Sequence, residues 1–346
     1  MTPPQKYQRC MVMAGGGFRF GYYLGIYAAL RNANKTPDLL LASCGGAIAA
    51  ALIQSLPDDT RRKDWISSPE MFQFWCGLRS SRQATILRAF LSAMKRRIFI
   101  KNAVVIPDLF NDFMFDVPAS LPLPDAFSAN TETAVAIIAG QLLFAENEVG
   151  QARGNRKLFA ETVFCAPRAA ELLRDMRSPL SLESFGNNAI ASDLLTDVNT
   201  PIAEAVRASI SDMFYFRCHT YQANHYIGGV IDLFPIEVAR QLADQVVMEL
   251  KGPYDQMYSI PALHAVLGID GNHRLEHVLQ QYAEHWIDTS DMEQVLLENQ
   301  IDKKIVWRRN KLELSMPKNY EAYLKMIDAQ WQYGYQRGVA GLAHSG

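Results

Sequence analysis

The chain has 346 residues, a formal net charge of −2 and 49% hydrophobic residues. This length and hydrophobic content allow a sizeable core, and the near-neutral charge argues against a nucleic-acid-binding protein, whose domain would be basic. Five cysteines without regular spacing give neither a disulfide framework nor a metal-ligand pattern. With no secretory leader and no apolar stretch of membrane-spanning length, we expect a cytoplasmic protein.

The first fifty residues predict an ordered series of strands and helices. Residues 10–14 form an apolar strand candidate, a glycine run follows, and residues 22–32 have helical spacing of apolar side chains. A second apolar strand at 39–41 breaks at Ser43-Cys44-Gly45-Gly46, and a helix resumes from 47 to about 56. This order predicts a right-handed crossover, and hence an α/β fold with a mainly parallel sheet.

The two glycine-rich turns are expected to be neighbours, because both follow strands whose carboxyl ends meet at one edge of the sheet. The turn at Cys44 has the form of a nucleophile elbow, with a thiol where a serine is usual. Gly15, Gly16 and Gly17 fit neither a P-loop nor a dinucleotide fingerprint. They are interpreted as an oxyanion loop, which Arg19 anchors or supplements as an anion-binding group. The alternative is a tight turn that simply needs glycine.

A basic segment without acidic residues occupies positions 71–107. Its charges are Arg79, Arg82, Arg88, Lys95, Arg96, Arg97 and Lys101. Apolar side chains fall at helical spacing between them, so the segment predicts an amphipathic helix. Two interpretations remain open, a lid packed on the domain or a helix lying on an anionic membrane surface.

The rest of the chain predicts strands at 134–143 and 159–164, and helices at 262–267, 274–286 and 320–340. We expect an α/β domain over residues 1–250 and a helical C-terminal extension over 251–346, packed on the core.

Four blocks together resemble the patatin-like phospholipases. They are Gly15-Gly16-Gly17-Phe18-Arg19, then Ala42-Ser43-Cys44-Gly45-Gly46-Ala47-Ile48, then the stretch 201–209, and finally Ile227-Gly228-Gly229-Val230-Ile231-Asp232-Leu233-Phe234-Pro235. The resemblance spans about residues 9–250 and implies a three-layer α/β/α sandwich. It also implies hydrolysis of lipid acyl esters without a metal or organic cofactor, with Gly15, Gly16, Gly17 and Gly45 stabilising the oxyanion.

The resemblance also identifies departures at the catalytic positions. Cys44 occupies the position of the family's serine nucleophile, and Ile227 occupies the position of its aspartate, where it cannot act as a base. Phe20 and Ala42 replace two glycines of the family pattern. The predicted function is therefore a lipid acyl hydrolase whose activity is lost or altered, with a non-catalytic lipid-binding or regulatory protein as the alternative.

Three hypotheses for the elbow follow from these residues. Cys44 is a working nucleophile with His225 as a speculative base, or it is a small buried residue in a vestigial site. In the third hypothesis, the elbow motif is aligned with a shift of one residue, so that Ser43 is the nucleophile. Asp212 and Asp232 are considered as substitute bases but are expected to have structural or surface roles. The His-x-x-Glu-His run at 273–277 is interpreted as a solvated helix face and not as a metal site.

Overall fold

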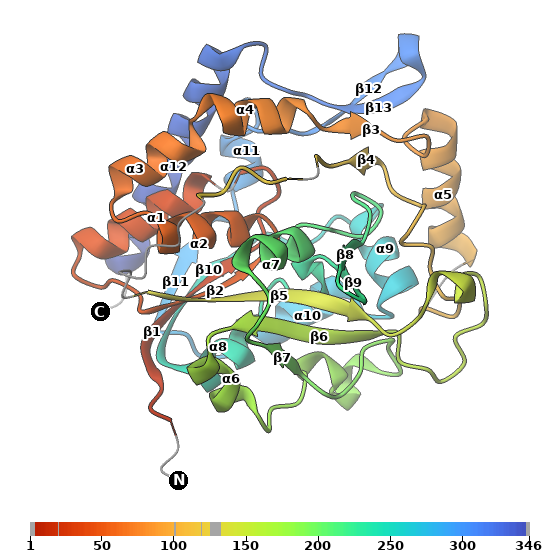
Figure 1. Ribbon diagram of the computed structural model, residues 1–346, viewed down its shortest axis with the longest axis horizontal. Helices are drawn as coiled ribbons and strands as arrows, with labels where there is room; N and C mark the ends of the chain where they lie inside the picture. Colours follow the sequence, from red (N-terminus) through yellow and green to blue (C-terminus); the bar gives the residue numbers. More distant parts are fainter. Residues whose placement is uncertain (1–3, 20, 100–101, 119, 125–132, 344–346) are drawn as a thin grey trace.

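The computed structural model describes residues 4–19, 21–99, 102–118, 120–124 and 133–343. Its centre is a twisted, mainly parallel sheet (Figure 1). The strand order is β11-β10-β1-β2-β5-β6-β7, with β9 also pairing β5 and β8 pairing β9. The strands are β1 (Tyr7–Ala14), β2 (Leu39–Ser43), β5 (Ala134–Leu142), β6 (Phe159–Cys165), β7 (Leu195–Asp197), β8 (His219–Tyr221), β9 (Asn224–Ile227), β10 (Ala243–Leu250) and β11 (His285–Asp288).

Helices cover both faces of this sheet, as the α/β pattern predicts. The longer ones are α1 (Gly21–Asn32), α2 (Gly45–Ser55), α3 (Asp59–Ile66), α4 (Pro69–Cys76), α5 (Ile86–Phe99), α7 (Ile202–Ser209), α9 (Ser259–Val266), α10 (Gly271–Leu279) and α12 (Tyr320–Ala343). Shorter ones are α6 (Pro167–Leu173), α8 (Ile236–Leu242) and α11 (Met292–Val295). Each described helix is too short or too polar to cross a lipid bilayer.

The central strands are apolar on both faces, because each face is buried under helices. In β1, Met11 and Met13 belong to the core beneath α1, α2 and α12, whereas Cys10 and Val12 belong to the opposite core with α8. Side chains alternate between the faces of a strand, so such a continuous apolar run is what a doubly covered parallel sheet requires. The three-layer α/β/α architecture expected from the sequence is present.

The chain beyond residue 250 is more varied than the expected helical extension. It contains α9, α10 and α12, but it also contributes β11 to the edge of the main sheet, where β11 pairs in parallel with β10. It forms an antiparallel hairpin as well, β12 (Lys303–Val306) with β13 (Lys311–Leu314). The hairpin is joined to the start of α5 by backbone hydrogen bonds, including one from Leu312 to Ala84 (2.7 Å). A four-residue strand is too short to be recognised by its periodicity.

The C-terminal helix α12 packs directly on α1 (Figure 1). Glycines on both helices allow this close approach: a Cβ on Gly334 would overlap the carbonyl oxygen of Tyr22, and a Cβ on Gly25 would overlap that of Trp331. Since the glycine loop immediately precedes α1, α12 also fixes the position of that loop.

Gly334→Ala is expected to destabilise the fold by about 2 kcal/mol or more, since the added methyl forces α12 away from α1 and exceeds the helix-propensity gain of alanine. Chemical denaturation of the full chain measures the change. Gln336→Ala, at an exposed position of the same helix, is the matched control and should stay within about 0.5 kcal/mol of the parent. Equal stabilities for the two variants would contradict the proposed packing constraint.

Candidate active site

The chain turns sharply at Cys44, between β2 and α2. Cys44 has φ 50° and ψ −125°, a conformation that side-chain-bearing residues rarely adopt and that is found at functional sites. Its backbone N–H donates to Ser209 Oγ (2.9 Å), and Ser209 Oγ donates to the carbonyl of Ile138 (2.6 Å). The end of α7 therefore holds the elbow against β5.

Glycines around the elbow allow three backbone segments to meet there. A Cβ on Gly45 would lie 2.5 Å from the carbonyl oxygen of Gly17, and one on Gly46 would overlap the carbonyl of Met13. A Cβ on Gly229 would lie 2.8 Å from the backbone nitrogen of Cys44. The glycine loop and the elbow are thus in contact, as the shared sheet edge predicts, and the Gly228-Gly229 turn meets the elbow as well.

The loop glycines differ in what their N–H groups do. Gly15, Gly16 and Gly17 all have positive φ, at 73°, 114° and 58°. The Gly15 N–H already has two acceptors, the carbonyls of Met13 in β1 (3.1 Å) and of Ser43 at the end of β2 (3.2 Å). Within the described part of the chain, the amides of Gly16, Gly17 and Gly45 donate no hydrogen bond. These three are the geometric candidates for oxyanion donors, whereas Gly15 shapes the loop.

Arg19 is held by the C-terminal part of the chain. Its Nε donates to Gln300 Oε1, and its guanidinium lies 3.7 Å from Glu293 Oε1. Gln330 of α12 accepts a hydrogen bond from the Gly21 N–H (3.3 Å) and donates to the carbonyl of Phe18 (3.4 Å). Arg19 therefore anchors the glycine loop while also lining the cavity beside Cys44. Phe20 lies outside the described residues.

The carboxylate of Asp212 is the direct partner of the Cys44 thiol. Cys44 Sγ donates to Asp212 Oδ1 at 2.9 Å. Asp212 comes from the turn after α7, and its carboxylate occupies the space above Gly228, where a Cβ would overlap Oδ1. The sequence analysis expected a structural or surface role for Asp212; the structure brings its carboxylate into direct contact with the thiol, the spacing that a nucleophile and its base require.

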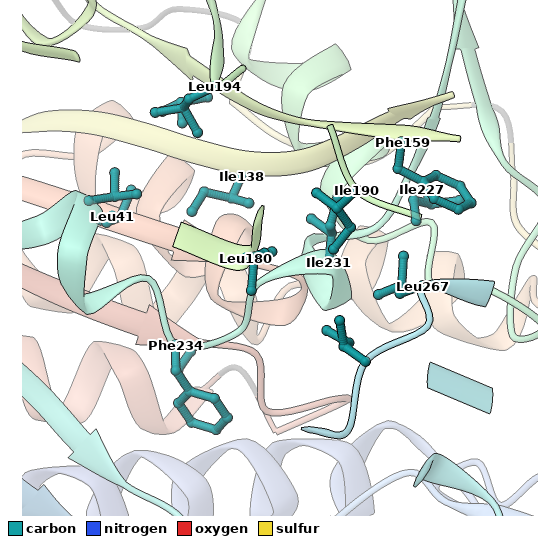
Figure 2. Close-up of a cluster of buried hydrophobic side chains, with 14 of the residues drawn as sticks. Leu41, Ile138, Phe159, Leu180, Ile190, Leu194, Ile227, Ile231, Phe234 and Leu267 are labelled. Carbon is teal, nitrogen blue, oxygen red and sulfur yellow. The ribbon is translucent and has the colours of Figure 1, made fainter. Parts of the chain in front are cut away.

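Ile227 and His225 do not approach the thiol. Ile227 is fully buried and packs against Gly140 of β5, among core side chains that include Phe159, Ile190 and Ile231 (Figure 2). His225 Nδ1 hydrogen-bonds Thr220 Oγ1 (2.8 Å), and its ring meets Phe110 edge-on. Along an extended strand side chains alternate between faces, and neither of these residues lines the cavity at Cys44.

Burial governs the ionisation of the pair. Desolvation raises the pKa of Asp212 to about 7, although the hydrogen bonds from Cys44 and from the backbone of Val230 act in the opposite direction. Burial, together with the charge of Asp212, raises the pKa of the Cys44 thiol well above its usual value. The resting pair is therefore a neutral thiol that donates to a carboxylate titrating near neutrality.

A buried charged cluster lies near the thiol. Glu249 Oε2 accepts hydrogen bonds from Tyr22 (3.1 Å) and Tyr23 (3.0 Å) and pairs with Lys251 Nζ (3.1 Å). Lys251 lines the cavity, and its positive charge favours the thiolate form of Cys44. Among the residues that the structure describes, Glu249 Oε1 has no hydrogen-bond partner, and burial raises the pKa of this carboxyl group.

Asp232 and the two histidines of the 273–277 run have structural contacts. Asp232 is buried against Arg274 (3.0 Å), and its backbone carbonyl accepts from Ser43 Oγ (2.9 Å). Ser43 therefore points away from the cavity and supports the elbow. His277 lies 3.3 Å from Glu237, and both histidine rings contact Phe185. In the described residues, no three His, Cys, Asp or Glu side chains gather as a metal ion would require.

Cys44 opens into a cavity of about 550 Å³, although only 4% of the residue is exposed. Polar groups of Arg19, Asp212 and Lys251 share this cavity with apolar walls. The apolar walls include Ile48, Trp75, Leu78, Ile210, Phe216 and Leu233. A nucleophile, a carboxylate and free amides at one end of an apolar cavity suit acyl transfer from a largely apolar ester.

Asp212, Glu249 and Lys251 are the site residues that sequence reasoning missed or undervalued. Asp212 lies 168 positions from Cys44, and no local pattern links it to the elbow. Its only signal is its position just after the 201–209 block, which precedes the Gly228-Gly229 turn in the family resemblance. Glu249 and Lys251 follow an ordinary buried strand, β10, and only the sheet topology places them beside β1.

Comparisons with known proteins give matches to solved structures and a match to a family profile. The crystal structure of VipD from Legionella pneumophila superimposes with a TM-score of 0.41 at 11% identity, covering 98% of this chain and 67% of that chain. No curated protein matches the sequence.

The second result covers two thirds of the sequence. The family profile described as patatin-like phospholipase matches residues 11–240, a range that includes the glycine loop, the Cys44 elbow, Asp212 and the Gly228-Gly229 turn. The chain therefore belongs to the patatin-like phospholipase family.

Proposed function

We propose that this protein is a lipid acyl-ester hydrolase in which Cys44 is the nucleophile and Asp212 is the base. The observation that carries the proposal is the 2.9 Å contact between Cys44 Sγ and Asp212 Oδ1. The family supplies lipids as the substrate class. In this proposal the carboxylate that the sequence lacks at Ile227 is supplied by the turn after α7.

Acylation begins when Sγ of Cys44 attacks the ester carbonyl and its proton passes to Asp212. The carbonyl oxygen becomes an oxyanion that the amides of Gly16, Gly17 and Gly45 stabilise. The intermediate then collapses, the C–O bond to the alcohol breaks, and Asp212 returns its proton to the leaving alkoxide. The products of this half-reaction are a thioester on Cys44 and a free alcohol.

Deacylation uses the same carboxylate in the opposite order. Asp212 takes a proton from water as the water oxygen attacks the thioester carbonyl, and the C–S bond breaks. The departing sulfur takes the proton back from Asp212, which restores the thiol and releases the carboxylic acid. An acid–base group with a pKa near 7 serves both directions at neutral pH.

A second candidate function is acyl-chain binding without turnover. The observation that favours it is the raised pKa of Cys44, because burial and the adjacent negative charge both oppose the thiolate. Such a protein would retain the cavity and bind the lipid, but no thioester would form.

Incubation with p-nitrophenyl butyrate is expected to give a burst of p-nitrophenol and a thioester on Cys44, detected by mass spectrometry of the intact chain. Asp212→Asn should slow acylation by about 10²-fold or more, since an amide cannot accept the proton. His225→Ala is the matched control and should react like the parent protein. If the ester binds but no adduct forms on Cys44, the protein binds acyl chains without turnover and the hydrolase proposal is wrong. An adduct on Ser43 would show that Ser43, and not Cys44, is the nucleophile.

The ionisation of Asp212 gives a prediction in pH. The acylation rate should rise with pH through about 7, because only the ionised carboxylate accepts the proton.

The same ionisation predicts a dependence of stability on pH. The pKa of Asp212 is higher in the folded state than in the unfolded state, so the protonated side chain favours folding. This contribution to the free energy of unfolding is complete below the unfolded pKa near 4 and is lost as pH rises through about 7. Asp212→Asn removes this loss, and the variant should gain on the order of 4 kcal/mol relative to the parent between pH 4 and pH 8, at about 1.4 kcal/mol for each unit of the pKa difference. Denaturation curves at both pH values measure it, and a pH-independent difference would contradict the buried carboxylate.

We further propose that the protein is cytoplasmic and contacts anionic membranes peripherally through α5. The helix exposes Leu87, Phe90, Leu91 and Ile98 together with Arg88, Lys95 and Arg97. Exposed apolar groups interleaved with basic groups favour adsorption to an anionic lipid surface. Of the seven basic residues noted in the sequence, Lys101 lies outside the described residues.

Replacing Arg88, Lys95 and Arg97 together by Gln should weaken binding to phosphatidylserine-containing vesicles by roughly 10²-fold, at about 1 kcal/mol for each charge. Vesicle co-sedimentation measures the partition coefficient. Gln at Arg61, Arg174 and Lys325, which are exposed elsewhere, changes net charge equally and is the matched control. An equal loss in both triple variants would show that only net charge matters and that α5 is not the docking surface.

A further inference from the structure

Lys251 is a buried cation near Cys44 that the proposed mechanism does not use. It follows β10, which pairs in parallel with β1, with Val247 opposite Met11. The carboxyl ends of parallel strands meet at one edge of the sheet, so Lys251 lies near the glycine loop that follows β1. Its side chain is 13% exposed and lines the cavity that contains Cys44.

The Lys251 ammonium is held by partners on α1 and β10. Nζ donates to the hydroxyls of Tyr22 (3.0 Å) and Tyr23 (3.4 Å) and pairs with Glu249 Oε2 (3.1 Å). Both hydroxyls in turn donate to Glu249 Oε2, at 3.1 Å and 3.0 Å. An ammonium has three donors, and these three acceptors use all of them. The positive charge therefore has a fixed position.

The ion pair is oriented with its positive end toward the thiol. Among the described residues, Lys251 lines the Cys44 cavity, whereas Glu249 is not part of this lining and is buried. Glu249 thus lies behind Lys251 as seen from the cavity. A fixed dipole of this orientation favours negative charge in the cavity, and no rearrangement is needed when that charge develops.

The same tyrosines support the candidate oxyanion loop. A Cβ on Gly16 would lie 3.0 Å from Tyr22 Cε1 and 3.4 Å from Tyr23 Cε2, so the loop packs on both rings. The rings also pack on each other, with centroids 4.1 Å apart. The network that holds Lys251 therefore supports Gly16 as well, whose amide is a candidate oxyanion donor.

A cation is needed at this site because the base is itself an anion. The charge of Asp212 opposes the thiolate and, together with burial, raises the pKa of Cys44, whereas reactive cysteines usually have a cation as neighbour. Burial, Cys44 and the backbone of Val230 set the pKa of Asp212, while Lys251 acts on the thiol. The charge of Lys251 therefore favours movement of negative charge from the carboxylate to the sulfur.

We propose that Lys251 is a positioning residue whose ammonium, fixed by its carboxylate and tyrosine partners, stabilises negative charge on Cys44 Sγ during acylation. The S–H bond breaks, its proton passes to Asp212 Oδ1, and the electron pair that stays on sulfur faces the fixed ammonium. The proposal rests on the proposed hydrolase function and adds a residue to its mechanism. The ionisation of Cys44 should then depend on Lys251 whether or not an ester is present.

Other titratable and charged groups face Cys44 and Lys251 from several elements, and they define the pH range of a test. Asp212 is largely ionised above its pKa of about 7. The tyrosines stay neutral below about pH 9, because burial raises the pKa of each above its usual value. The facing groups are Tyr22 and Tyr23 on α1, Arg19 in the glycine loop, Asp212 after α7, Glu249 on β10 and Tyr254 after β10.

Alkylation by iodoacetamide measures the thiolate of Cys44 without any ester. The full chain is treated between about pH 7.5 and about pH 9, and the peptide that contains Cys44 is quantified by mass spectrometry. Lys251→Met should displace the profile of rate against pH by about one unit to higher pH, so that alkylation at a given pH is about tenfold slower. Lys251→Arg keeps the charge and should restore most of the parent rate. Asp212→Asn removes the opposing charge and should displace the profile to lower pH.

Lys325→Met is the matched control, because it removes a lysine charge from an exposed position of α12. Its profile should coincide with that of the parent protein. If Lys251→Met fails to fold, as a thermal melt shows, the double variant Lys251→Met, Glu249→Gln removes both buried charges and leaves neither unpaired. It should displace the profile in the same direction, since the positive end of the pair faces the thiol.

An unchanged profile for folded Lys251→Met protein would overturn the proposal. Equal displacements with methionine and arginine would also overturn it, because packing and not charge would then be responsible. Acylation by p-nitrophenyl acetate, followed in parallel, separates these results from the hydrolase function. If Lys251→Met shifts the alkylation profile but the parent is never acylated, Lys251 tunes the thiol and the hydrolase function is wrong. If the parent is acylated and the profile does not depend on Lys251, only the proposal for Lys251 is wrong.

Discussion

The backbone conformation at Cys44 is the constraint on which the rest of the site depends. A residue with a side chain at φ 50° and ψ −125° carries a cost on the order of 1–3 kcal/mol. That cost is offset by the hydrogen bond from Cys44 N–H to Ser209 and by packing that only glycine allows, with Gly45 against Gly17 and Gly46 against Met13. Because the glycine loop packs on Gly45, the candidate oxyanion donors are fixed relative to the thiol by the same contacts.

The position of the Asp212 carboxylate also depends on the backbone around Cys44, although Asp212 comes from a distant part of the chain. Gly228 leaves the space that the Asp212 side chain occupies, and the Gly228 N–H donates to the carbonyl of Ser211 (2.8 Å), which fixes the turn before Asp212. Because Asp212 supplies the carboxylate beside the thiol, Ile227 can pack in the hydrophobic core. A nucleophile–base pair is defined by the distance between its atoms and not by the order of its residues, so a change at one sequence position does not by itself remove the pair.

The sequence predicted the features that depend on interactions between residues close together in the chain. It did not predict those that depend on contacts between distant residues. β1, the glycine loop, β2 and the elbow depend on local patterns of apolar residues and glycines, and they appear where expected. Asp212, β11 and the internal hydrogen bonds of Gly15 depend on contacts between distant segments. A family resemblance transfers roles by alignment, so it assigned the base position to Ile227 and could not show that the carboxylate of Asp212, from another element, contacts the thiol.

The energetics of the buried charges bear on whether this site is used or vestigial. Burying the carboxyl of Asp212 and leaving Glu249 Oε1 without a hydrogen bond both destabilise the fold. An apolar side chain at either position would relieve that cost, as is often found when buried ionic groups are replaced. Asp212 lines the cavity at Cys44, and Glu249 pairs with Lys251, which lines it as well. Buried carboxyl groups that are present at such a cost are typical of functional sites, and this is the physical argument for the proposed chemistry at Cys44 over simple binding.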